Sequence, residues 1–284
     1  MHARHSARWL AMAGAALLCL LPCAGAAPPQ RVMSLNLCAD QLLLALLPPQ
    51  RIASLTWLSR SEGDPQWLPL ARQLPANHGT AEEVLAVRPD LVIAGAYTTS
   101  ATRRLLARTQ TPLLLLQPVQ DWDGIRAVTR EVAAAVGAVA RGEQLLAEMD
   151  ATLAALAATR PADPVRVIGW SGGTDVPGRD TLFDAILTAA GGVNIGASVS
   201  GRSGFDLEQL LALRPEVLMR GAAYAATPTL RNDAAQHRVV RRLYGGAQLR
   251  YPEALYGCGV PQSAQAAVQL RMQWLALRAR PLAP

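Results

Sequence analysis

One fifteen-residue pattern occurs twice in this chain, and it constrains the fold more than any other feature. Residues 81–95 read AEEVLAVRPDLVIAG, and residues 207–221 read LEQLLALRPEVLMRG. Aligned without a gap, the copies share a glutamate at Glu82 and Glu208, then an Arg-Pro pair and a closing glycine. In each copy a helix-like segment stops before a proline and a short apolar strand follows. The repeat predicts two similar lobes.

Strand-like and helix-like segments alternate through both halves of the sequence. We expect strands at residues 31–36, 51–55, 90–95, 112–117 and 165–170, and helices at residues 40–47, 80–88, 102–109 and 181–190. Such alternation is typical of α/β proteins with parallel sheets. A long helical region over about residues 122–159 separates the copies, and we expect it to join the two lobes.

The first 26 residues have the pattern of an export signal. A basic start is followed by an apolar, uncharged run at residues 9–21 and by the small residues AGA at 24–26. This pattern predicts a signal peptide over residues 1–26 and a periplasmic protein. The apolar run is short for a membrane span, which needs ~20 residues. Lipid attachment at Cys23 is not expected, because Pro22 precedes it.

Composition excludes several classes of function. The chain contains no lysine, so neither a phosphate loop of the G-x-x-x-x-G-K-[ST] type nor Schiff-base chemistry is available. Beyond the leader, only His78, His237, Cys38 and Cys258 remain of the four histidines and four cysteines. A three-histidine zinc site and a cysteine-rich zinc site are therefore excluded. The charge is modest and forms no dense basic run with aromatic residues, so nucleic acid is not an expected partner.

One motif favours an enzyme. Residues 169–173 (GWSGG) match the G-x-S-x-G pattern of α/β-hydrolases, with Ser171 as the nucleophile and His237 downstream. Against a hydrolase, the residues after Ser171 are rich in turn formers, whereas a nucleophile elbow requires a helix there. A hydrolase also leaves the repeat unexplained. We therefore expect a protein that is not an enzyme.

The repeat, the segment RVMSLNLCADQLLLAL at residues 31–46 and the long helix together resemble one family. They are similar to the periplasmic substrate-binding proteins of iron-chelate and vitamin B12 ABC importers, over essentially the whole mature chain. The resemblance implies an α/β fold of two similar three-layer lobes with mostly parallel sheets, joined by one long rigid helix, with the ligand in the cleft between them. We assign residues 27–138 to the N-terminal lobe, 139–161 to the bridging helix and 162–284 to the C-terminal lobe.

The same resemblance implies the function. The chain is expected to capture an iron chelate (a ferric siderophore or haem) or a corrinoid such as cobalamin, with no cofactor of its own. It would deliver this ligand as a monomer to an ABC permease dimer in the inner membrane. Glu82 and Glu208 are then expected to dock onto arginines of the permease, although a carboxylate in a first helical turn also stabilises its helix by ~0.3–1 kcal/mol. Two lobes of this kind could also serve a receptor for bare metal ions or an adaptor that binds protein.

Candidate ligand-binding residues follow from the rule that ligands bind beyond the carboxyl ends of parallel strands. Aromatic faces and arginine donors at these places suit a large, flat or anionic chelate. The candidates at the strand ends or in the loops near them are Asn36, Cys38, Trp57, His78, Tyr97, Trp170, Arg202, Arg220, Tyr224, Tyr256 and Cys258.

The two remaining cysteines allow three interpretations. Cys38 and Cys258 are expected in equivalent loops of opposite lobes, facing the cleft. Export to an oxidising compartment permits a disulfide between them. Two free thiols lining the site, or two buried inert cysteines, are equally compatible with the sequence.

Overall fold

The computed structural model describes residues 27–96, 98–173, 176–198, 205–222 and 233–279. The expected signal peptide and the candidates Tyr97, Arg202 and Tyr224 lie outside these residues. Within the described ranges, no helix combines the length and the apolar character that crossing a membrane requires.

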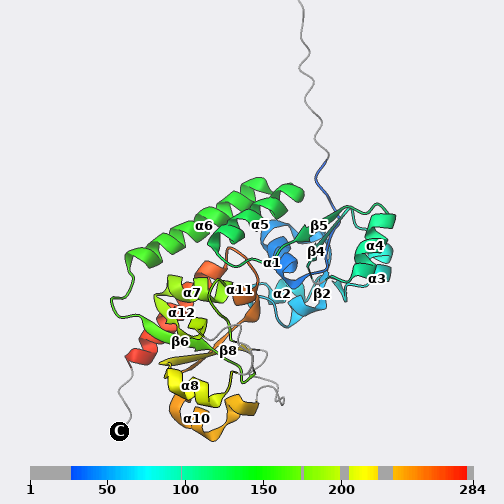
Figure 1. Cartoon of the computed structure of the whole chain (residues 1–284). Coiled ribbons are helices and arrows are strands. Elements are labelled where there is room, and N and C mark those ends of the chain that lie inside the picture. The colour runs from blue at the N-terminus through cyan, green and yellow to red at the C-terminus, as the bar shows by residue number, and fades with distance from the viewer. Residues whose placement is uncertain (1–26, 97, 174–175, 199–204, 223–232, 280–284) are drawn as a thin grey trace, which may run out of the picture.

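Two separate parallel sheets form the frame of the molecule (Figure 1). The N-terminal sheet has the order β3-β2-β1-β4-β5, and the C-terminal sheet has the order β7-β6-β8-β9. Strands of the repeat, β4 and β8, each pair with the first strand of their sheet, β1 and β6. The N-terminal strands are β1 (Val32–Ser34), β2 (Ile52–Thr56), β3 (Ala76–Asn77), β4 (Leu91–Gly95) and β5 (Leu113–Leu116). The C-terminal strands are β6 (Val165–Gly169), β7 (Gly192–Asn194), β8 (Val217–Gly221) and β9 (Gln248–Tyr251).

Helices cover both faces of each sheet, so each lobe has three layers. In the N-terminal lobe one face packs against α1 (Leu37–Leu46) and α5 (Trp122–Ala135), and the other against α3 (Ala81–Val87) and α4 (Ser100–Arg108). In the C-terminal lobe one face packs against α7 (Leu182–Ala190) and α12 (Ser263–Arg278), and the other against α8 (Leu207–Leu213) and α10 (Arg238–Tyr244). The short helices are α2 (Leu68–Ala71) and α11 (Glu253–Gly257), and the 3-10 segments are Pro49–Arg51, Trp57–Arg60, Ile195–Ser198 and Asp233–Gln236. The expectation of two three-layer α/β lobes is confirmed.

A single long helix, α6 (Val139–Ala158), spans from one lobe to the other (Figure 1). Its 20 residues correspond to a length of about 30 Å. On the N-terminal side it packs against α5, where Gly142 permits close approach, since a Cβ there would lie 2.6 Å from the Cβ of Ala133. On the C-terminal side it packs against α7 and α12. Buried Arg271 of α12 donates to the carbonyl oxygens of Leu156 and Ala190, which joins the ends of these helices.

The repeat extends further in three dimensions than in the sequence. Arg88 and Arg214, which end α3 and α8, both take the left-handed conformation with φ of 48°. The guanidinium of Arg31 donates to the carbonyl of Val87 at the end of α3, at 2.7 Å. Arg166 makes the same bond near the end of α8, where it donates to the carbonyl of Leu213 at 2.8 Å.

The acidic residue after each Arg-Pro pair completes this arrangement. Asp90 accepts a hydrogen bond from the backbone N–H of Arg31, and Glu216 accepts one from that of Arg166. Each acid therefore locks the turn after the repeat helix to the first strand of its lobe.

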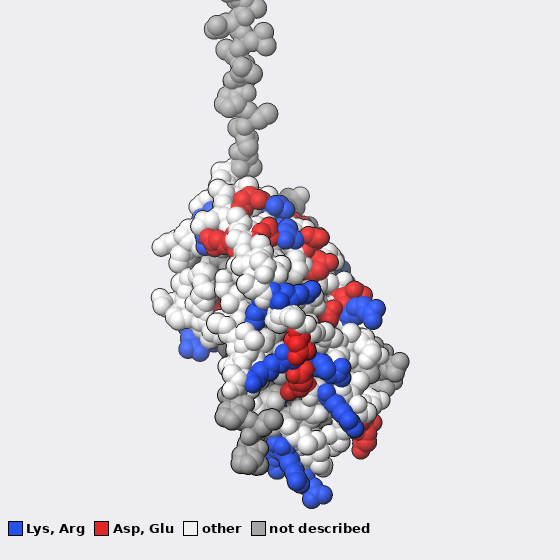
Figure 2. All heavy atoms as spheres, turned by 90° about the vertical axis from the view of Figure 1, so that its left-hand side faces the viewer, with Lys and Arg blue, Asp and Glu red and all other residues white. Residues whose placement is uncertain are grey.

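Charges on the face shown in Figure 2 are interspersed, with acidic side chains between the arginines.

Candidate functional site

A disulfide bond joins the two lobes, beside a small cavity that both lobes line. Cys38 lies in the first turn of α1, in the N-terminal lobe, and Cys258 directly follows α11, in the C-terminal lobe. Their Cα atoms are 4.8 Å apart, and their separation in the chain is 220 residues. Of the three interpretations left open by the sequence, the structure selects the disulfide, so neither cysteine has a free thiol. The expectation that Cys38 follows its strand in a loop is wrong, because α1 begins at Leu37.

Asn36 explains why α1 begins early. Its side-chain oxygen accepts hydrogen bonds from the backbone N–H groups of Cys38, at 2.8 Å, and Ala39, at 3.1 Å. Asparagine is a strong N-cap residue, and here it holds the helix turn that carries the disulfide. A cavity of about 100 Å³ beside it is lined from both lobes, including Asn36, Cys38 and Gly259.

A larger cavity of about 310 Å³ lies between the segment after β5 and the C-terminal lobe. An aromatic cluster of Phe183, Tyr251 and Tyr256 lines it, with ring centroids 4.6–5.8 Å apart. Tyr256 is buried, and burial raises the pKa of its phenol, which therefore stays protonated at neutral pH. Of the three rings, the sequence predicted only Tyr256. Tyr251 obeys the strand-end rule as the last residue of β9, but that strand is not obvious in the sequence.

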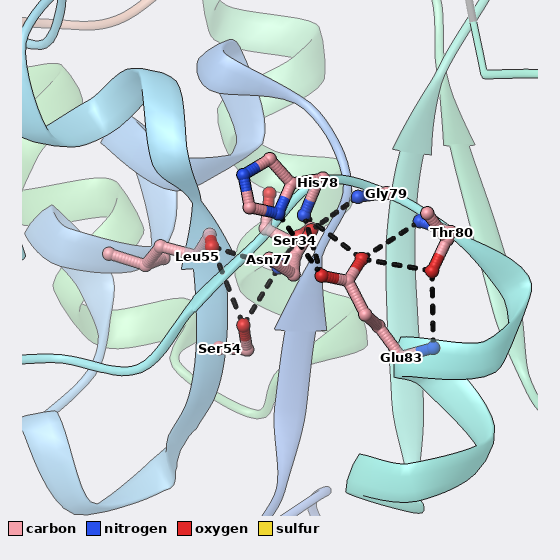
Figure 3. Close-up of polar contacts among 8 residues, drawn as sticks. All are labelled: Ser34, Ser54, Leu55, Asn77, His78, Gly79, Thr80 and Glu83. Carbon is pink, nitrogen blue, oxygen red and sulfur yellow. Dashed lines mark hydrogen bonds and ion pairs between the residues drawn. The ribbon is translucent and has the colours of Figure 1, made fainter.

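Buried polar contacts join the strand ends of the N-terminal sheet (Figure 3). Asn77, at the end of β3, donates from its amide to the Ser34 carbonyl at 3.0 Å, the Ser54 hydroxyl at 2.8 Å and the Leu55 carbonyl at 2.8 Å. One side chain thus ties the ends of three neighbouring strands together. These bonds also hold in place the segment that follows Asn77 in the chain.

Buried Asp40 supports the same edge from α1. Its carboxyl group accepts hydrogen bonds from the backbone N–H of Thr56, at 3.1 Å, and from the hydroxyl of Thr56. Burial raises the pKa of Asp40 to about 7, although these bonds act in the opposite direction. Thr56 is the residue before Trp57, so Asp40 fixes the start of the segment that carries this candidate.

Trp57 and His78, which the sequence singled out separately, come together beyond the ends of β2 and β3. Their rings lie 6.2 Å apart, centroid to centroid, at an interplanar angle of 26°. Trp57 is 47% exposed. His78 donates from its backbone N–H to Glu83 at 2.9 Å, and its ring Nδ1 lies 3.3 Å from the same carboxylate.

The C-terminal edge differs from the expectation at Trp170. Trp170 is buried at 2% exposure, its indole N–H donates to the carbonyl of Gly173 at 2.7 Å, and its ring packs edge-on against Phe205. It therefore belongs to the core between β6 and α8 rather than to the cleft surface. The strand-end rule placed Trp170 at the correct end of its strand but could not say which face it joins.

A hydrolase finds no support in the geometry. No helix begins after Ser171 in the described part of the chain until α7, which starts at Leu182. His237 caps α10, where its Nδ1 accepts from the N–H of Val239. Neither side chain has the placement that a nucleophile elbow demands.

Arg220 is a buried cation near the end of β8. It is 5% exposed, and within the described residues its Nε and Nη2 atoms have no hydrogen-bond partner. Burial lowers the pKa of Arg220, and so does the charge of Arg250, its register partner on β9. Two neighbouring cations suit an anionic group of a ligand.

Glu82 and Glu208 occupy equivalent exposed positions in the first turns of α3 and α8. Among the residues that the structure describes, neither carboxylate forms an ion pair or a hydrogen bond. Glu83 differs, because it closes a capping box with Thr80. Over the same ranges, no group of three His, Cys, Asp or Glu side chains could hold a metal ion.

Comparison with known proteins gives a consistent result. A family model described as "Periplasmic binding protein" matches residues 32–242. No curated protein matches the chain. A solved haem-binding protein from Roseiflexus sp. RS-1, in its apo form, is 24% identical with a TM-score of 0.70, covering 87% of this chain and 98% of its own.

Two structures from Vibrio cholerae have the same fold. The periplasmic haem-binding protein is 18% identical with a TM-score of 0.72, over 86% of this chain and 98% of its own. The periplasmic vitamin B12 binding protein is 17% identical with a TM-score of 0.63, over 89% of this chain and 99% of its own. At these identities the likeness concerns the fold.

Proposed function

Because the chain belongs to the periplasmic binding protein family, we propose that it captures a metal chelate in the cleft between its lobes and delivers it to an ABC permease. The chelate is haem, a corrinoid or a ferric siderophore. Related folds bind haem or vitamin B12, as their descriptions state, which supports this class of ligand. In this proposal the protein is a monomeric receptor and catalyses no reaction.

The observation that carries the proposal is the chemistry of the cleft. Aromatic rings line a cavity between the segment after β5 and the C-terminal lobe, Trp57 and His78 stack beyond the ends of β2 and β3, and Arg220 is a buried cation whose Nε and Nη2 atoms have no hydrogen-bond partner among the described residues. Such a surface fits a large ligand with a flat apolar body and anionic substituents. The described residues hold no set of ligands for a bare metal ion, so the metal would arrive already chelated.

A titration tests the ligand class. The purified protein is titrated with haem, cobalamin, cobinamide and several ferric siderophores while tryptophan fluorescence is recorded. We expect one class to quench the fluorescence at micromolar concentration or below. Trp57→Phe should reduce the signal, because Trp57 is the most exposed tryptophan in the described structure: Trp67 and Trp122 are half-buried, and Trp170 and Trp274 are buried. Absence of binding by every chelate would contradict the proposal.

Delivery to the permease is proposed to use Glu82 and Glu208. Their equivalent positions on the two lobes would set the register of a two-fold partner, and complementary charges speed encounter. We expect Glu82→Arg combined with Glu208→Arg to abolish chelate uptake through the reconstituted permease while ligand affinity stays unchanged. Glu131→Arg, on the exposed face of α5, is the matched control. Uptake unaffected by the double substitution would contradict docking at these residues.

Little lobe motion is proposed to accompany binding. The lobes are connected by α6 and by the disulfide between Cys38 and Cys258, which restrain opening at two places. Solution scattering curves of the free and loaded protein should therefore nearly coincide.

A periplasmic location is proposed on the signal-peptide pattern and on the disulfide, which oxidising compartments maintain.

A further inference from the structure

A second short sequence occurs in both lobes, outside the fifteen-residue repeat. Residues 103–105 and residues 241–243 both read Arg-Arg-Leu. The first copy lies on α4, which precedes β5, the edge strand beside β4. The second lies on α10, which precedes β9, the edge strand beside β8. Because β4 and β8 are the strands of the repeat, the two arginine pairs occupy equivalent helices of the two lobes.

The two helices also pack in the same way around these arginines. In each helix the residue before the pair and the residue four positions further on are buried: Thr102 and Leu106 on α4, and Val240 and Tyr244 on α10. Residues four apart share one face of a helix, so each helix packs on its lobe through that face. Of the arginines, Arg103 is half-buried, and Arg104, Arg241 and Arg242 are exposed.

None of these four arginines has an acidic partner within the described ranges. Arg104 donates only to the hydroxyl of Ser100 on its own helix, at 3.4 Å, and no acidic residue occurs in α4 or α10. Other exposed arginines of the same outer layers form no ion pair with a described residue either. Together they make up the arginine surface, which consists of Arg88, Arg103, Arg104 and Arg108 in the N-terminal lobe and Arg214, Arg238, Arg241 and Arg242 in the C-terminal lobe.

Arginines beside the bridging helix are paired, in contrast. Nη2 of Arg126 lies 2.5 Å from Oδ1 of Asp150, and Nε of Arg130 lies 2.8 Å from Oε1 of Glu143. Both arginines are on α5, which packs against α6, whereas the helices of the arginine surface cover the other face of each sheet (Figure 1). Positive charge is therefore neutralised on the side of α6 and left without acidic partners on the outer layers.

The charge and chemistry of the arginine surface favour a lipid partner. Glu82 and Glu208, the proposed docking residues, share its helices α3 and α8 or lie beside them. Permease arginines that attract these glutamates would repel the arginines around them. The bilayer around a permease offers anionic phosphate groups, which guanidinium groups bind through paired hydrogen bonds. Leu243, 57% exposed directly after Arg242, is an apolar side chain of the kind that enters the headgroup boundary.

We propose that the arginine surface binds anionic phospholipids of the membrane that holds the permease. The inference goes beyond the proposed function, because it requires no bound chelate. Contact through both lobes turns the outer layers, and with them Glu82 and Glu208, toward the membrane. The receptor then searches for its permease along a surface rather than through the whole compartment. Each arginine near an anionic bilayer adds to the binding, and salt weakens the attraction.

Co-sedimentation with lipid vesicles tests the proposal. The mature protein is mixed with vesicles of phosphatidylcholine alone, or of phosphatidylcholine and phosphatidylglycerol in equal amounts. We expect binding to the second kind only, and weaker binding at higher salt. At about fivefold for each arginine, Arg103→Gln with Arg104→Gln should weaken binding about 20-fold, and so should Arg241→Gln with Arg242→Gln. All four substitutions together should weaken it more than about 100-fold.

The matched control is Arg126→Gln combined with Arg130→Gln, which removes two positive charges from the side of α6. Vesicle binding should be nearly unchanged in this variant, and circular dichroism confirms the folding of every variant. Equal binding to both kinds of vesicle would overturn the inference. So would an equal loss of binding in the control and in either pair on the arginine surface, because net charge alone would then explain it.

Two further measurements separate the lipid from the permease and from the chelate. Glu82→Arg combined with Glu208→Arg should retain vesicle binding. Arginine-dependent binding to the permease in phosphatidylcholine nanodiscs, without binding to anionic vesicles, would assign these arginines to the permease and overturn the inference. Arginine-dependent vesicle binding by a protein that binds no chelate would support the inference while removing the proposed function.

Discussion

Arg31 in the N-terminal lobe and Arg166 in the C-terminal lobe make the same connection, from the first strand to the end of the repeat helix. The rims of the two lobes show no such correspondence. In the N-terminal lobe Thr80 and Glu83 form a capping box that also anchors His78, whereas α8 has only Asp206, which caps the N–H of Gln209. The two lobes therefore share a frame, whereas the residues that begin their repeat helices make different contacts.

The two lobes also differ in the side chains at the ends of their strands. On the N-terminal side the strand ends are joined by buried polar groups, with Asn77 and Asp40 at the centre. On the C-terminal side, Phe183, Tyr251 and Tyr256 form an aromatic wall. Two lobes with one scaffold therefore present two unlike surfaces, and the disulfide restrains the separation of the lobes.

Removal of the disulfide should have the largest effect on the stability of the two lobes. We expect Cys38→Ser combined with Cys258→Ser to lower the free energy of unfolding by about 2–5 kcal/mol, because the bridge restrains the unfolded chain. The lobes should then unfold in two separate transitions. Urea denaturation followed by tryptophan fluorescence and by circular dichroism measures both effects. Coincident transitions at unchanged stability would show that α6 alone couples the lobes.

Asp40 should make the stability of the N-terminal lobe depend on pH. Its pKa is about 7 in the folded state against 3.8 for an unperturbed carboxyl, so between these values the folded state binds more protons than the unfolded state. The free energy of unfolding should therefore fall as pH rises from about 4 to about 7, by a few kcal/mol, and level off above.

Asp40→Asn tests this prediction. In urea denaturation, the free energy of unfolding of this variant should fall much less across that pH range. A small fall should remain, because burial also raises the pKa of Asp64. Asp184→Asn, in the first turn of α7 in the other lobe, should keep the parent profile. Equal profiles for the parent and Asp40→Asn would contradict an uncharged Asp40 in the folded protein.

The helix caps should give the smallest difference between lobes. Thr80→Ala removes a capping box and should cost about 1–2 kcal/mol, whereas Asp206→Ala removes a single cap and should cost about 0.5–1 kcal/mol. Hydrogen exchange of the amides in α3 and α8 locates each loss. Thr80→Ser and Asp206→Asn, which retain an acceptor, should stay near the parent value, and equal losses in both lobes would remove the distinction between the two rims.

The sequence predicted the two lobes because the repeat encodes packing that each copy must satisfy alone. It missed the beginning of α1 although Asn36, a good N-cap before an apolar run, is a recognisable start signal. Trp170 was misplaced because the position of a residue after a strand does not fix the direction of its side chain. The contact of Trp57 with His78 depends on the packing of two loops, which no local pattern encodes.

The disulfide can form only after the C-terminal lobe has been synthesised as far as Cys258. Cys38 is among the first residues of the folded chain, and its partner stands close to the other end. A polypeptide made from its N-terminus therefore carries an open thiol at Cys38 until 220 further residues have been added. Any product that stops short of Cys258 keeps that thiol, which chemically labels it as unfinished and distinguishes it from the mature molecule.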